Sequence, residues 1–263
     1  MNTLKDRRII LTGATGGIGK ELAKLLLTHG CKLGCIGRSQ KKLEQLYSSL
    51  NNDNNMSLIQ ADITTSAGRQ QIVDQMDADF QGYDMLINAA GIMDFTSFVE
   101  QQDDRIENIF NTNIIAPMLL CKKVIPAMLS QNKGHIVNIG STFGSIGFAW
   151  FSAYSSSKFA LRGFSQALRR ELAETPIKIS YIAPRAVKTS LNSSSVYSMA
   201  EDVKMNMDMP DMVAKQIVQS IIKAHKEKYL GFPESLFVLI NAILPGLVDM
   251  ATRSQNISAK KYI

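Results

Sequence analysis

Tyr154 and Lys158 lie four residues apart in a segment with helical periodicity, so their side chains are expected on one face of a helix. A phenol has an unperturbed pKa of about 10, and a nearby ammonium group lowers that pKa by favouring the phenolate. Such a pair suits general acid–base catalysis near neutral pH. Ser141 follows an expected strand, His135–Gly140, that would end beside the pair. Because this spacing also occurs on ordinary surface helices, the pair predicts a catalytic site only in combination with other candidate residues at the same place.

A glycine-rich turn follows the first expected strand, Arg8–Thr12, and opens the first expected helix. Glycine lets the main chain approach a pyrophosphate, and the helix N-terminus presents free N–H groups to the phosphates. A dinucleotide-binding turn requires this strand–turn–helix context, whereas glycine-rich turns alone are common. The sequence therefore predicts a dinucleotide site to which the turn contributes Gly13, Thr15, Gly17, Ile18 and Gly19.

The residues after the second expected strand, Lys32–Ile36, indicate which dinucleotide is preferred. An acidic residue here would bind the ribose 2′-hydroxyl of NAD, whereas an arginine accommodates the 2′-phosphate of NADP. The chain has Arg38 and no acidic residue. We therefore predict that NADP(H) is preferred over NAD(H); the alternative is that Arg38 is an ordinary surface arginine.

Asp62 and Ile63 follow the third expected strand, Ser57–Gln60, and are further candidates for cofactor binding. Asp62 could accept a hydrogen bond from the amino group of adenine. Its other possible role is to cap the next helix, which Thr64 or Ser66 could also do.

Asn88, Ala89 and Gly91 lie at the end of the fourth expected strand, Met85–Asn88. Small residues here leave room for a flat ring, and Asn88 can tie neighbouring strands together. Ligands of open α/β sheets bind outside the carboxyl ends of the strands, so all these candidates are expected at one crevice.

Short apolar runs alternate with segments of helical period along most of the 263 residues. This alternation implies right-handed crossovers and a parallel sheet covered by helices on both faces. We therefore expect an α/β fold with a doubly wound parallel sheet, in a single domain over 1–263. The remaining expected elements are a strand at Lys178–Ile182, a helix from Ile18 that stops near Gly30, a helix capped by Ser39 that runs to Leu50, and helices at Ser66–Met76, Asp103–Leu129 and Ala153–Ala173.

Five motifs occur in an order that resembles the short-chain dehydrogenase/reductase family in its single-domain form. They are T-G-x-x-x-G-x-G at 12–19, N-x-A-G at 88–91, a helical asparagine at Asn113, a serine at Ser141, and Y-x-x-x-K at Tyr154 and Lys158. The resemblance runs from about 9 to 189. It implies a Rossmann fold and a nicotinamide-dependent oxidoreductase.

The resemblance also implies a role for each catalytic candidate. Tyr154 would donate a proton to a carbonyl oxygen or take one from an alcohol, and Lys158 would bind the nicotinamide ribose and lower the pKa of Tyr154. Ser141 would hydrogen-bond the reacting oxygen. Asn113 would hold a water that links Lys158 to solvent. The hydride comes from the cofactor, and no metal is needed.

One segment departs from the family pattern. After the expected sixth strand the family usually has proline and glycine, but this chain has Pro184 followed by Arg185. Pro184, Val187 and Thr189 still match residues that, in the family, cradle the nicotinamide carboxamide. The change could place a charge near the cofactor or the substrate, or Arg185 could be a surface side chain.

Composition narrows the possible functions. Apolar residues make up 45% of the chain and charged residues 20%, which suits a globular protein able to bury a core without disulfides or metal. The net charge of +6 is scattered, without a basic stripe interleaved with aromatic residues, so nucleic-acid binding is not expected. It could favour a phosphorylated cofactor or an anionic membrane, although a solvated basic surface is the preferred interpretation.

The three cysteines and the N-terminus suit a reducing compartment. Cys31 and Cys35 lie near His29, and we expect buried thiols there rather than a metal site. The sequence contains neither a signal-peptide pattern nor an uninterrupted run of about 18 apolar residues. We expect a cytoplasmic protein, with membrane association through the C-terminal segment as an open alternative.

Segment 190–210 is expected to form a substrate lid, as in the family. It contains Met199, Met205, Met207 and Met209, and methionines adapt to irregular apolar space. Aromatic residues between Ser141 and Tyr154 are expected to line the same pocket or the core; they are Phe143, Phe148, Trp150 and Phe151. An apolar substrate is indicated.

The C-terminal extension, 234–263, is least like the family. Residues 236–250 are mostly apolar, but they are too few to span a bilayer as one straight helix, and Pro245 should break them. The segment could pack over the active site, contact another subunit, or lie at a membrane surface near the cations of 253–261. Packing or a subunit contact is preferred.

We therefore expect an NADP(H)-dependent oxidoreductase that interconverts an alcohol and a carbonyl on a small or lipid-like apolar substrate. A cofactor-sensing binding protein is the alternative, although it would not need Ser141, Tyr154 and Lys158 together. Epimerases and dehydratases of the wider family are usually longer, with a larger substrate domain. By analogy with the family, the long helices carrying Asn113 and Tyr154 would form a homodimer or homotetramer.

Overall fold

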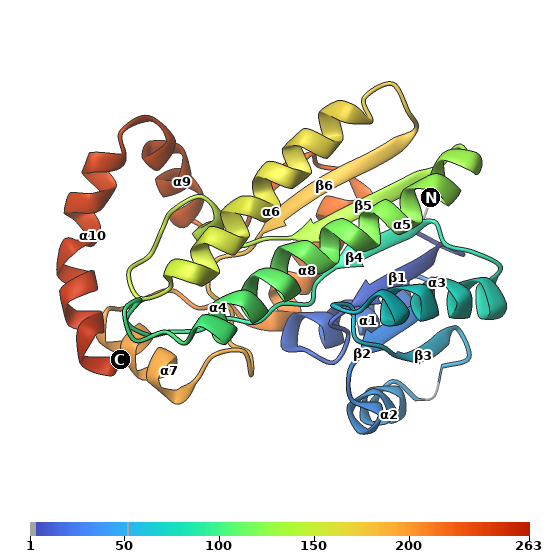
Figure 1. Ribbon diagram of the computed structural model, residues 1–263, viewed down its shortest axis with the longest axis horizontal. Helices are drawn as coiled ribbons and strands as arrows, with labels where there is room; N and C mark the ends of the chain where they lie inside the picture. The colour runs from blue at the N-terminus through green and yellow to red at the C-terminus, as the bar shows by residue number, and fades with distance from the viewer. Residues whose placement is uncertain (1–3, 52) are drawn as a thin grey trace.

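The computed structural model describes residues 4–51 and 53–263, which form one layer of parallel strands between two layers of helices (Figure 1). Within these residues the sheet has seven strands in the order β3-β2-β1-β4-β5-β6-β7, and each adjacent pair is parallel. The strand order reverses between β1 and β4, which places a crevice at their carboxyl ends. The expected doubly wound α/β sheet is confirmed.

The elements follow the expected alternation, with small changes at their ends. The strands are β1 Arg8–Thr12, β2 Lys32–Gly37, β3 Met56–Gln60, β4 Met85–Asn88, β5 Gly134–Ile139, β6 Ile177–Ala183 and β7 Glu227–Tyr229. The α-helices are α1 Gly17–Thr28, α2 Gln40–Ser49, α3 Ser66–Phe80, α4 Asp103–Phe110, α5 Ala116–Ser130, α6 Ser152–Glu171, α7 Ser194–Asp202, α8 Pro210–Ile222, α9 Glu234–Ile243 and α10 Pro245–Ala259. Shorter helical turns are η1 Asn111–Ile115, η2 Thr142–Gly144 and η3 Lys260–Tyr262.

Side-chain caps start two of the helices that flank the cofactor crevice. The hydroxyl of Ser39 accepts a hydrogen bond from the Lys42 N–H at 3.4 Å and caps α2, as expected. None of the three candidates for the cap of α3, which were Asp62, Thr64 and Ser66, is its N-cap, because Thr65 takes this role by accepting a hydrogen bond from the Gly68 N–H at 3.0 Å.

Each face of the sheet is buried by its own set of helices. On one face Leu22 of α1 and Ile217 of α8 pack with Leu11 of β1. On the other face Val124 of α5 packs in the cluster that contains Ile10 of β1. Neighbouring residues of β1 therefore belong to different cores, as expected of a strand buried on both sides.

The long helix expected over 103–129 is continuous but changes its geometry at η1, which is a π-helical turn. Pro117 has no N–H to bond to the carbonyl of Asn113, and the π turn lies directly before it. The described residues contain one helical stretch, Asp103–Ser130, that is long and apolar enough to cross a membrane. A core helix has the same properties, and Val124 is fully buried against the sheet.

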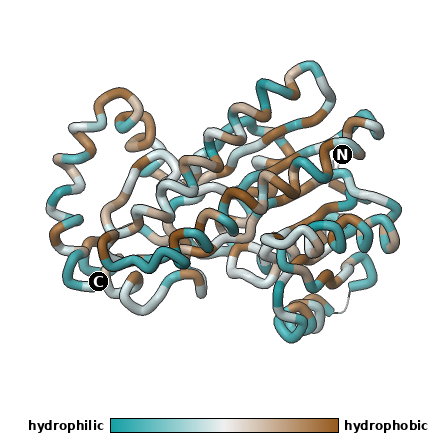
Figure 2. Tube along the Cα trace, viewed as in Figure 1, coloured by the Kyte–Doolittle hydropathy of each residue, from teal (hydrophilic) through white to brown (hydrophobic). Residues whose placement is uncertain are grey.

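The C-terminal extension forms a helical hairpin, α9 and α10, that stands beside the sheet at the left of Figure 1. The helix is interrupted at Leu244, immediately before Pro245, as expected. Asn241 of α9 donates a hydrogen bond to the Ser145 carbonyl at 2.9 Å, and the Trp150 indole donates one to the Asn256 carbonyl of α10 at 3.1 Å. In Figure 2 the central strands and part of this hairpin are strongly hydrophobic.

Candidate active site

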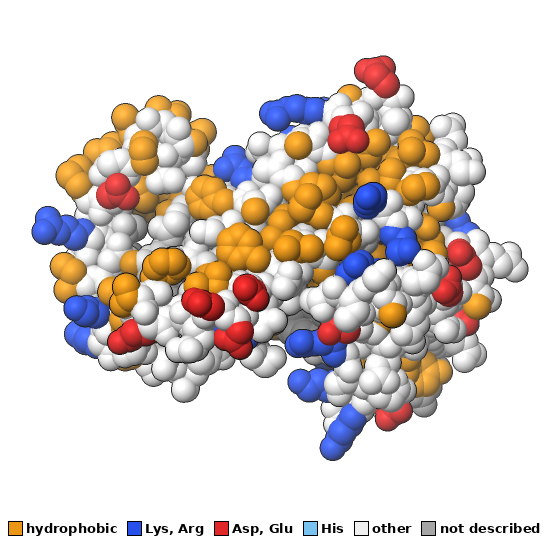
Figure 3. Space-filling model, viewed as in Figure 1, with side chains coloured by type: hydrophobic (Ala, Val, Ile, Leu, Met, Phe, Trp, Pro, Cys, Tyr) orange, Lys and Arg blue, Asp and Glu red, His pale blue; other side chains and the backbone are white. Residues whose placement is uncertain are grey.

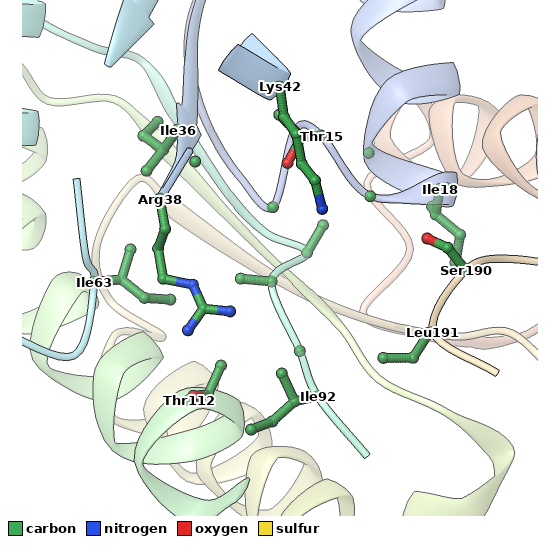
Figure 4. Close-up of a pocket in the computed structure, with 18 of the residues that line it drawn as sticks. Thr15, Ile18, Ile36, Arg38, Lys42, Ile63, Ile92, Thr112, Ser190 and Leu191 are labelled. Atoms are coloured by element: carbon green, nitrogen blue, oxygen red, sulfur yellow. The ribbon is translucent and has the colours of Figure 1, made fainter. Parts of the chain in front are cut away.

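A cavity of about 350 Å³ lies at the carboxyl ends of β1, β2, β3 and β4, where the strand order reverses. The glycine turn forms one wall, and the loop after β4 and residues 189–191 form others (Figure 4). The cavity brings together eleven of the predicted cofactor residues: Gly13, Thr15, Gly17, Ile18, Gly19, Arg38, Asp62, Ile63, Ala89, Gly91 and Thr189.

The turn between β1 and α1 needs glycine for two separate reasons. Gly13 has a φ of +67°, in the left-handed region, and a Cβ added there would lie 2.7 Å from the Ala90 nitrogen. A Cβ at Gly19 would clash with the Gly13 carbonyl oxygen. Gly16 is the N-cap of α1 and has no side chain to accept hydrogen bonds from the free N–H groups. These groups and the positive end of the helix dipole fit an anionic pyrophosphate.

Two cations, Arg38 and Lys42, point into the cavity near the end of β2 (Figure 4). Arg38 was predicted from the sequence as a cofactor residue, whereas Lys42 was not. Lys42 lies in the first turn of α2, whose cap at Ser39 was expected. The direction of the Lys42 side chain could therefore have been predicted from the sequence. Together the two side chains offer the positive charge and the donors that a phosphate monoester requires.

Asp62 lines the same cavity as an ionised carboxylate. Burial acts to raise the pKa of Asp62, but hydrogen bonds from Thr64 and the charges of Arg38 and Arg69 lower it overall. The Thr64 N–H and hydroxyl donate to the same Asp62 oxygen at 2.9 and 2.7 Å. These two hydrogen bonds to Asp62 therefore fix the loop after β3 where it borders the cavity.

A second cavity, of about 120 Å³, adjoins the first. The two cavities share five lining residues, which are Ile18, Ala89, Gly91, Thr189 and Leu191. Three of the four predicted catalytic side chains, Ser141, Tyr154 and Lys158, line this second cavity, together with Pro184 and Val187. The structure thus places the predicted acid–base group next to the cofactor crevice, as the sequence indicated.

Tyr154 and Lys158 lie on one face of α6, both buried. The Lys158 Nζ donates a hydrogen bond to the Ile139 carbonyl at 3.1 Å and lies 5.8 Å from the centroid of the Tyr154 ring. Burial raises the pKa of Tyr154 to about 12, opposed by a hydrogen bond with Ser141, and burial lowers the pKa of Lys158 to about 8. The expected lowering of the phenol pKa by Lys158 is therefore not found in this structure, where burial raises that pKa instead.

Ser141 is held in place by Tyr181 of β6, a residue that the sequence analysis missed. The Tyr181 hydroxyl donates to the Ser141 carbonyl at 3.3 Å and accepts from the Ser141 N–H at 3.5 Å. The Ser141 hydroxyl accepts a hydrogen bond from the Phe143 N–H at 3.1 Å and caps η2. Nothing in the local sequence around Tyr181 indicates this contact, because the two residues are 40 positions apart.

Two predicted site residues, Asn88 and Asn113, line neither cavity. The Asn88 amide donates to the Asn138 Oδ1 at 2.8 Å and joins β4 to β5, which confirms the strand-tying role. Asn113 bonds through its amide to both the N–H and the carbonyl of Ile92, at 2.9 and 2.8 Å. A Cβ at Gly91 would lie 3.4 Å from the Asn113 Oδ1 and 3.6 Å from the Lys158 Nζ, so both side chains lie close to Gly91.

The wall of the second cavity opposite the cofactor crevice is apolar. Its side chains come from the loop after β4, from η2, from the N-cap of α6, and from the segment expected to be a lid: Met93, Phe143, Phe151, Val196, Met199, Met205 and Met207. Met209 is half exposed and lies outside this wall, and Phe148 stacks on Phe143 with ring centroids 5.2 Å apart. Trp150 bonds to α10 instead. This lining suits an apolar group of modest size.

Arg185 also lines the second cavity, but its charge is bound by carboxylates. Its guanidinium makes a two-point contact with Asp208, at 2.9 and 2.7 Å, and a third contact with Glu234 at 2.8 Å. The alternative of a surface side chain is therefore wrong, since Asp208 and Glu234 hold this side chain between the segment expected to form a lid and α9.

The three cysteines are free and buried, which confirms the expectation for Cys31 and Cys35. Burial raises the pKa of the Cys31 and Cys121 thiols to about 12, so neither is poised as a nucleophile. Within 4–51 and 53–263, no three His, Cys, Asp or Glu side chains cluster in a way that could hold a metal ion.

Comparisons with known proteins agree with this geometry. The family model for short chain dehydrogenase matches residues 7–200. Dehydrogenase/reductase SDR family member 7B of Bos taurus is 30% identical over 98% of this chain and 85% of its own length. An uncharacterized oxidoreductase of Staphylococcus aureus (strain MRSA252) is 29% identical over 84% of this chain and 93% of its own.

Solved structures show the same fold. The closed form of a serine dehydrogenase complexed with NADP+ has a TM-score of 0.76 and 28% identity, covering 85% of this chain and 94% of that one. A short chain dehydrogenase/reductase from Burkholderia phymatum in complex with NAD has a TM-score of 0.85 at 19% identity, covering 94% and 96%. The second of these likenesses concerns the fold alone.

Proposed function

Because the chain belongs to the short-chain dehydrogenase/reductase family and is an NAD(P)-dependent oxidoreductase, we propose that it interconverts an alcohol and an aldehyde or ketone on an apolar substrate. The observation that carries this proposal is the position of Tyr154, Lys158 and Ser141. They line a small apolar cavity that adjoins the larger, cation-lined crevice. A hydride donor in the crevice and a carbonyl in the apolar cavity would meet beside the phenol.

The preference for NADP(H) is the second part of the proposal. Arg38 and Lys42 both point into the crevice near the end of β2, which is where the 2′-phosphate would lie. The related serine dehydrogenase was solved with NADP+. A neutral 2′-hydroxyl would leave both cations without an anionic partner from the cofactor, so NAD(H) should bind more weakly.

A nicotinamide cofactor held in the crevice would supply the hydride that the carbonyl carbon accepts. Tyr154 donates its phenolic proton to the carbonyl oxygen, and Ser141 donates a hydrogen bond to the same oxygen as negative charge develops there. Lys158 would hold the nicotinamide ribose, and its ammonium would stabilise the phenolate left on Tyr154. In the reverse direction that phenolate takes the proton from the alcohol. Burial raises the pKa of Tyr154 to about 12 and so favours the protonated phenol, which is the form that reduction requires.

The substrate class follows from the lining of the second cavity. Phe143, Phe151 and Met199 make its wall apolar, and the charge of Arg185 is neutralised by Asp208. A small or lipid-like carbonyl compound would bury its apolar part there, with its oxygen at Ser141 and Tyr154. The related serine dehydrogenase acts, by its name, on a polar amino acid. The apolar wall favours a different substrate in this protein.

Oxidation of NADPH against a panel of aldehydes, ketones and quinones tests the proposal, with Tyr154→Phe as the decisive variant. We expect turnover of apolar members, lost in Tyr154→Phe while NADPH binding is retained. Tyr47→Phe, in α2 outside both cavities, is the matched control and should keep full turnover. Undiminished turnover in Tyr154→Phe would overturn the mechanism. Tight NADPH binding without turnover of any carbonyl would instead favour the cofactor-sensing binding protein.

We further propose a cytoplasmic homo-oligomer built on the long helices. Exposed Ile115, Met118 and Leu119 follow Asn113, and exposed Phe159 lies on α6. Figure 3 shows hydrophobic side chains gathered over this part of the visible face. Burying such a patch in a dimer or tetramer would remove apolar surface from water. Light scattering after size exclusion would show a monomer if the proposal is wrong.

The outer face of the α9–α10 hairpin is a second apolar surface. Leu239, Ile243 and Leu247 are exposed there, although the inner face packs on α7 and η2. We propose a subunit contact for this face, with a membrane surface as the alternative. An Ile243→Ser/Leu247→Ser variant separates them: loss of assembly favours the subunit contact, and loss of co-sedimentation with anionic liposomes favours the membrane.

A further inference from the structure

Three chain segments meet at the guanidinium of Arg185. The loop after β6 carries Arg185 itself, Asp208 ends the lid segment, and Glu234 begins α9. Besides its contacts with the two carboxylates, the Arg185 Nη1 donates to the Phe232 carbonyl at 3.0 Å. The other oxygen of Glu234 accepts a hydrogen bond from Asn206 at 3.0 Å. One side chain thus links the lid and the hairpin to the loop that follows β6.

The end of the lid is also fixed to that loop by its main chain. Asp208 forms a parallel bridge with Val187, in which the Lys188 N–H donates to the Asp208 carbonyl at 2.9 Å and the Asp208 N–H donates to the Ala186 carbonyl at 2.9 Å. Val187 lines the second cavity. The Arg185–Asp208 ion pair therefore supports a short β-bridge that borders the cavity of the proposed catalytic side chains.

The surroundings of Arg185 are shaped to its side chain. A Cβ at Gly231, whose φ is +93°, would lie 2.6 Å from the Arg185 Cδ, so the loop before α9 approaches the arginine stem closely. The Arg185 side chain is 17% exposed and lines the apolar cavity. The cavity therefore meets an aliphatic stem and a neutralised charge rather than a free cation.

We propose that Arg185 is a positioning residue that fastens the lid and the C-terminal hairpin to the loop after β6 and thereby completes the apolar substrate cavity. The inference rests on the proposed function, because it assigns substrate affinity to that cavity. A glycine, which stands here in the family pattern, could make none of these contacts. Without the guanidinium, Asp208 and Glu234 would each lose their cationic partner, and the link from the loop after β6 to the lid and α9 would be weakened.

Arg185→Met keeps the apolar stem and removes only the charged group. We expect the KM for an apolar carbonyl substrate to rise about tenfold or more, the size expected for losing a partly buried two-point ion pair. The kcat and the NADPH Kd should change much less. Arg185→Lys keeps the charge without the planar two-point geometry and should recover part of the affinity. A direct readout of the lid is trypsin cleavage after Lys204, which is exposed within this segment. That cleavage should accelerate in Arg185→Met.

Arg8→Met is a matched control at the opposite end of the sheet. Arg8 is 18% exposed and makes the same two-point contact with Asp84, at 3.0 and 2.8 Å, but touches neither cavity. It should lower stability without changing KM or cleavage after Lys204. Unchanged KM and unchanged cleavage in Arg185→Met would overturn the inference, as would equal effects in Arg8→Met. If the wild-type protein turns over no carbonyl, the proposed function fails, while the cleavage comparison still decides whether Arg185 holds the lid.

Discussion

The Nζ of Lys158 lies 5.8 Å from the centroid of the Tyr154 ring and is bonded to the Ile139 carbonyl. Burial shifts the pKa values of the two groups in opposite directions. It disfavours the charged form of each group, which is the phenolate of Tyr154 and the ammonium of Lys158. The pKa of Tyr154 rises to about 12 and that of Lys158 falls to about 8. At neutral pH the site therefore holds a protonated phenol beside a lysine that is close to losing its charge.

The first prediction concerns the pH dependence of carbonyl reduction. Reduction needs protonated Tyr154 and charged Lys158, and the lysine loses its proton first as the pH rises. We expect kcat/KM for reduction to be flat below about pH 8 and to fall above it, since this quantity reports groups of the free enzyme. The measurement is initial-rate kinetics between pH 6 and 10.

Lys158→Arg provides the control for that profile. A guanidinium keeps its charge throughout this pH range, so the fall above about pH 8 should disappear even if the overall rate is lower. The same fall in Lys158→Arg would show that another group titrates, and a rise of the wild-type rate above this pH would contradict the assignment.

The second prediction concerns Lys42 in cofactor selection. Lys42→Met should weaken NADPH binding by about five- to tenfold, because one charge-assisted contact to the 2′-phosphate is lost, and should leave NADH binding unchanged. Lys41→Met is the matched control, because Lys41 is the adjacent exposed lysine and does not line the crevice. Fluorescence titration with both cofactors gives the four dissociation constants. Equal losses for NADPH and NADH would refute a role at the 2′-phosphate.

Much of this site could be predicted from the sequence because it is built from local patterns. The glycine turn lies between a strand and a helix, and Tyr154 and Lys158 are one helical turn apart. Arg38 follows a strand whose end was placed within one residue. Each of these features depends on secondary structure, and periodicity finds secondary structure of this length reliably.

The residues that were missed or misjudged depend on tertiary contacts. Arg185 is 23 positions from Asp208 and 49 from Glu234, so its ion pairs could not be read from neighbouring residues. Tyr181 reaches Ser141 across the β5–β6 pair, and β7 is only three residues long, too short to show a period. The raised pKa of Tyr154 likewise comes from burial by chain segments distant in sequence.

The third prediction concerns acid stability and His135. Burial, with smaller contributions from Lys178 and Arg7, lowers the pKa of His135 from 6.5 to about 4, while its ring bonds to Ser180. Between pH 6.5 and pH 4 the unfolded chain therefore binds a proton at His135 that the folded chain does not bind. The contribution of neutral His135 to the free energy of unfolding is fully present above pH 6.5 and is lost as the pH falls toward 4. By pH 4.5 this loss should reach about 2 to 3 kcal/mol.

Urea unfolding at pH 7 and pH 4.5 measures that loss. His135→Gln should lose most of the difference between the two pH values, whatever its stability at pH 7. An unchanged pH difference in His135→Gln would assign the acid sensitivity to other groups.

The fourth prediction compares two glycines within helices. A Cβ at Gly19 of α1 would clash with the Gly13 carbonyl, whereas a Cβ at Gly163 of α6 meets nothing within 4 Å. Gly19→Ala should therefore cost about 1 to 3 kcal/mol of stability and weaken NADPH binding, because the turn must shift away from the pyrophosphate. Gly163→Ala should stabilise the protein by about 0.5 to 1 kcal/mol and leave binding unchanged. Urea unfolding and NADPH titration of both variants decide the matter, and equal stabilities would show that the turn tolerates a Cβ at Gly19.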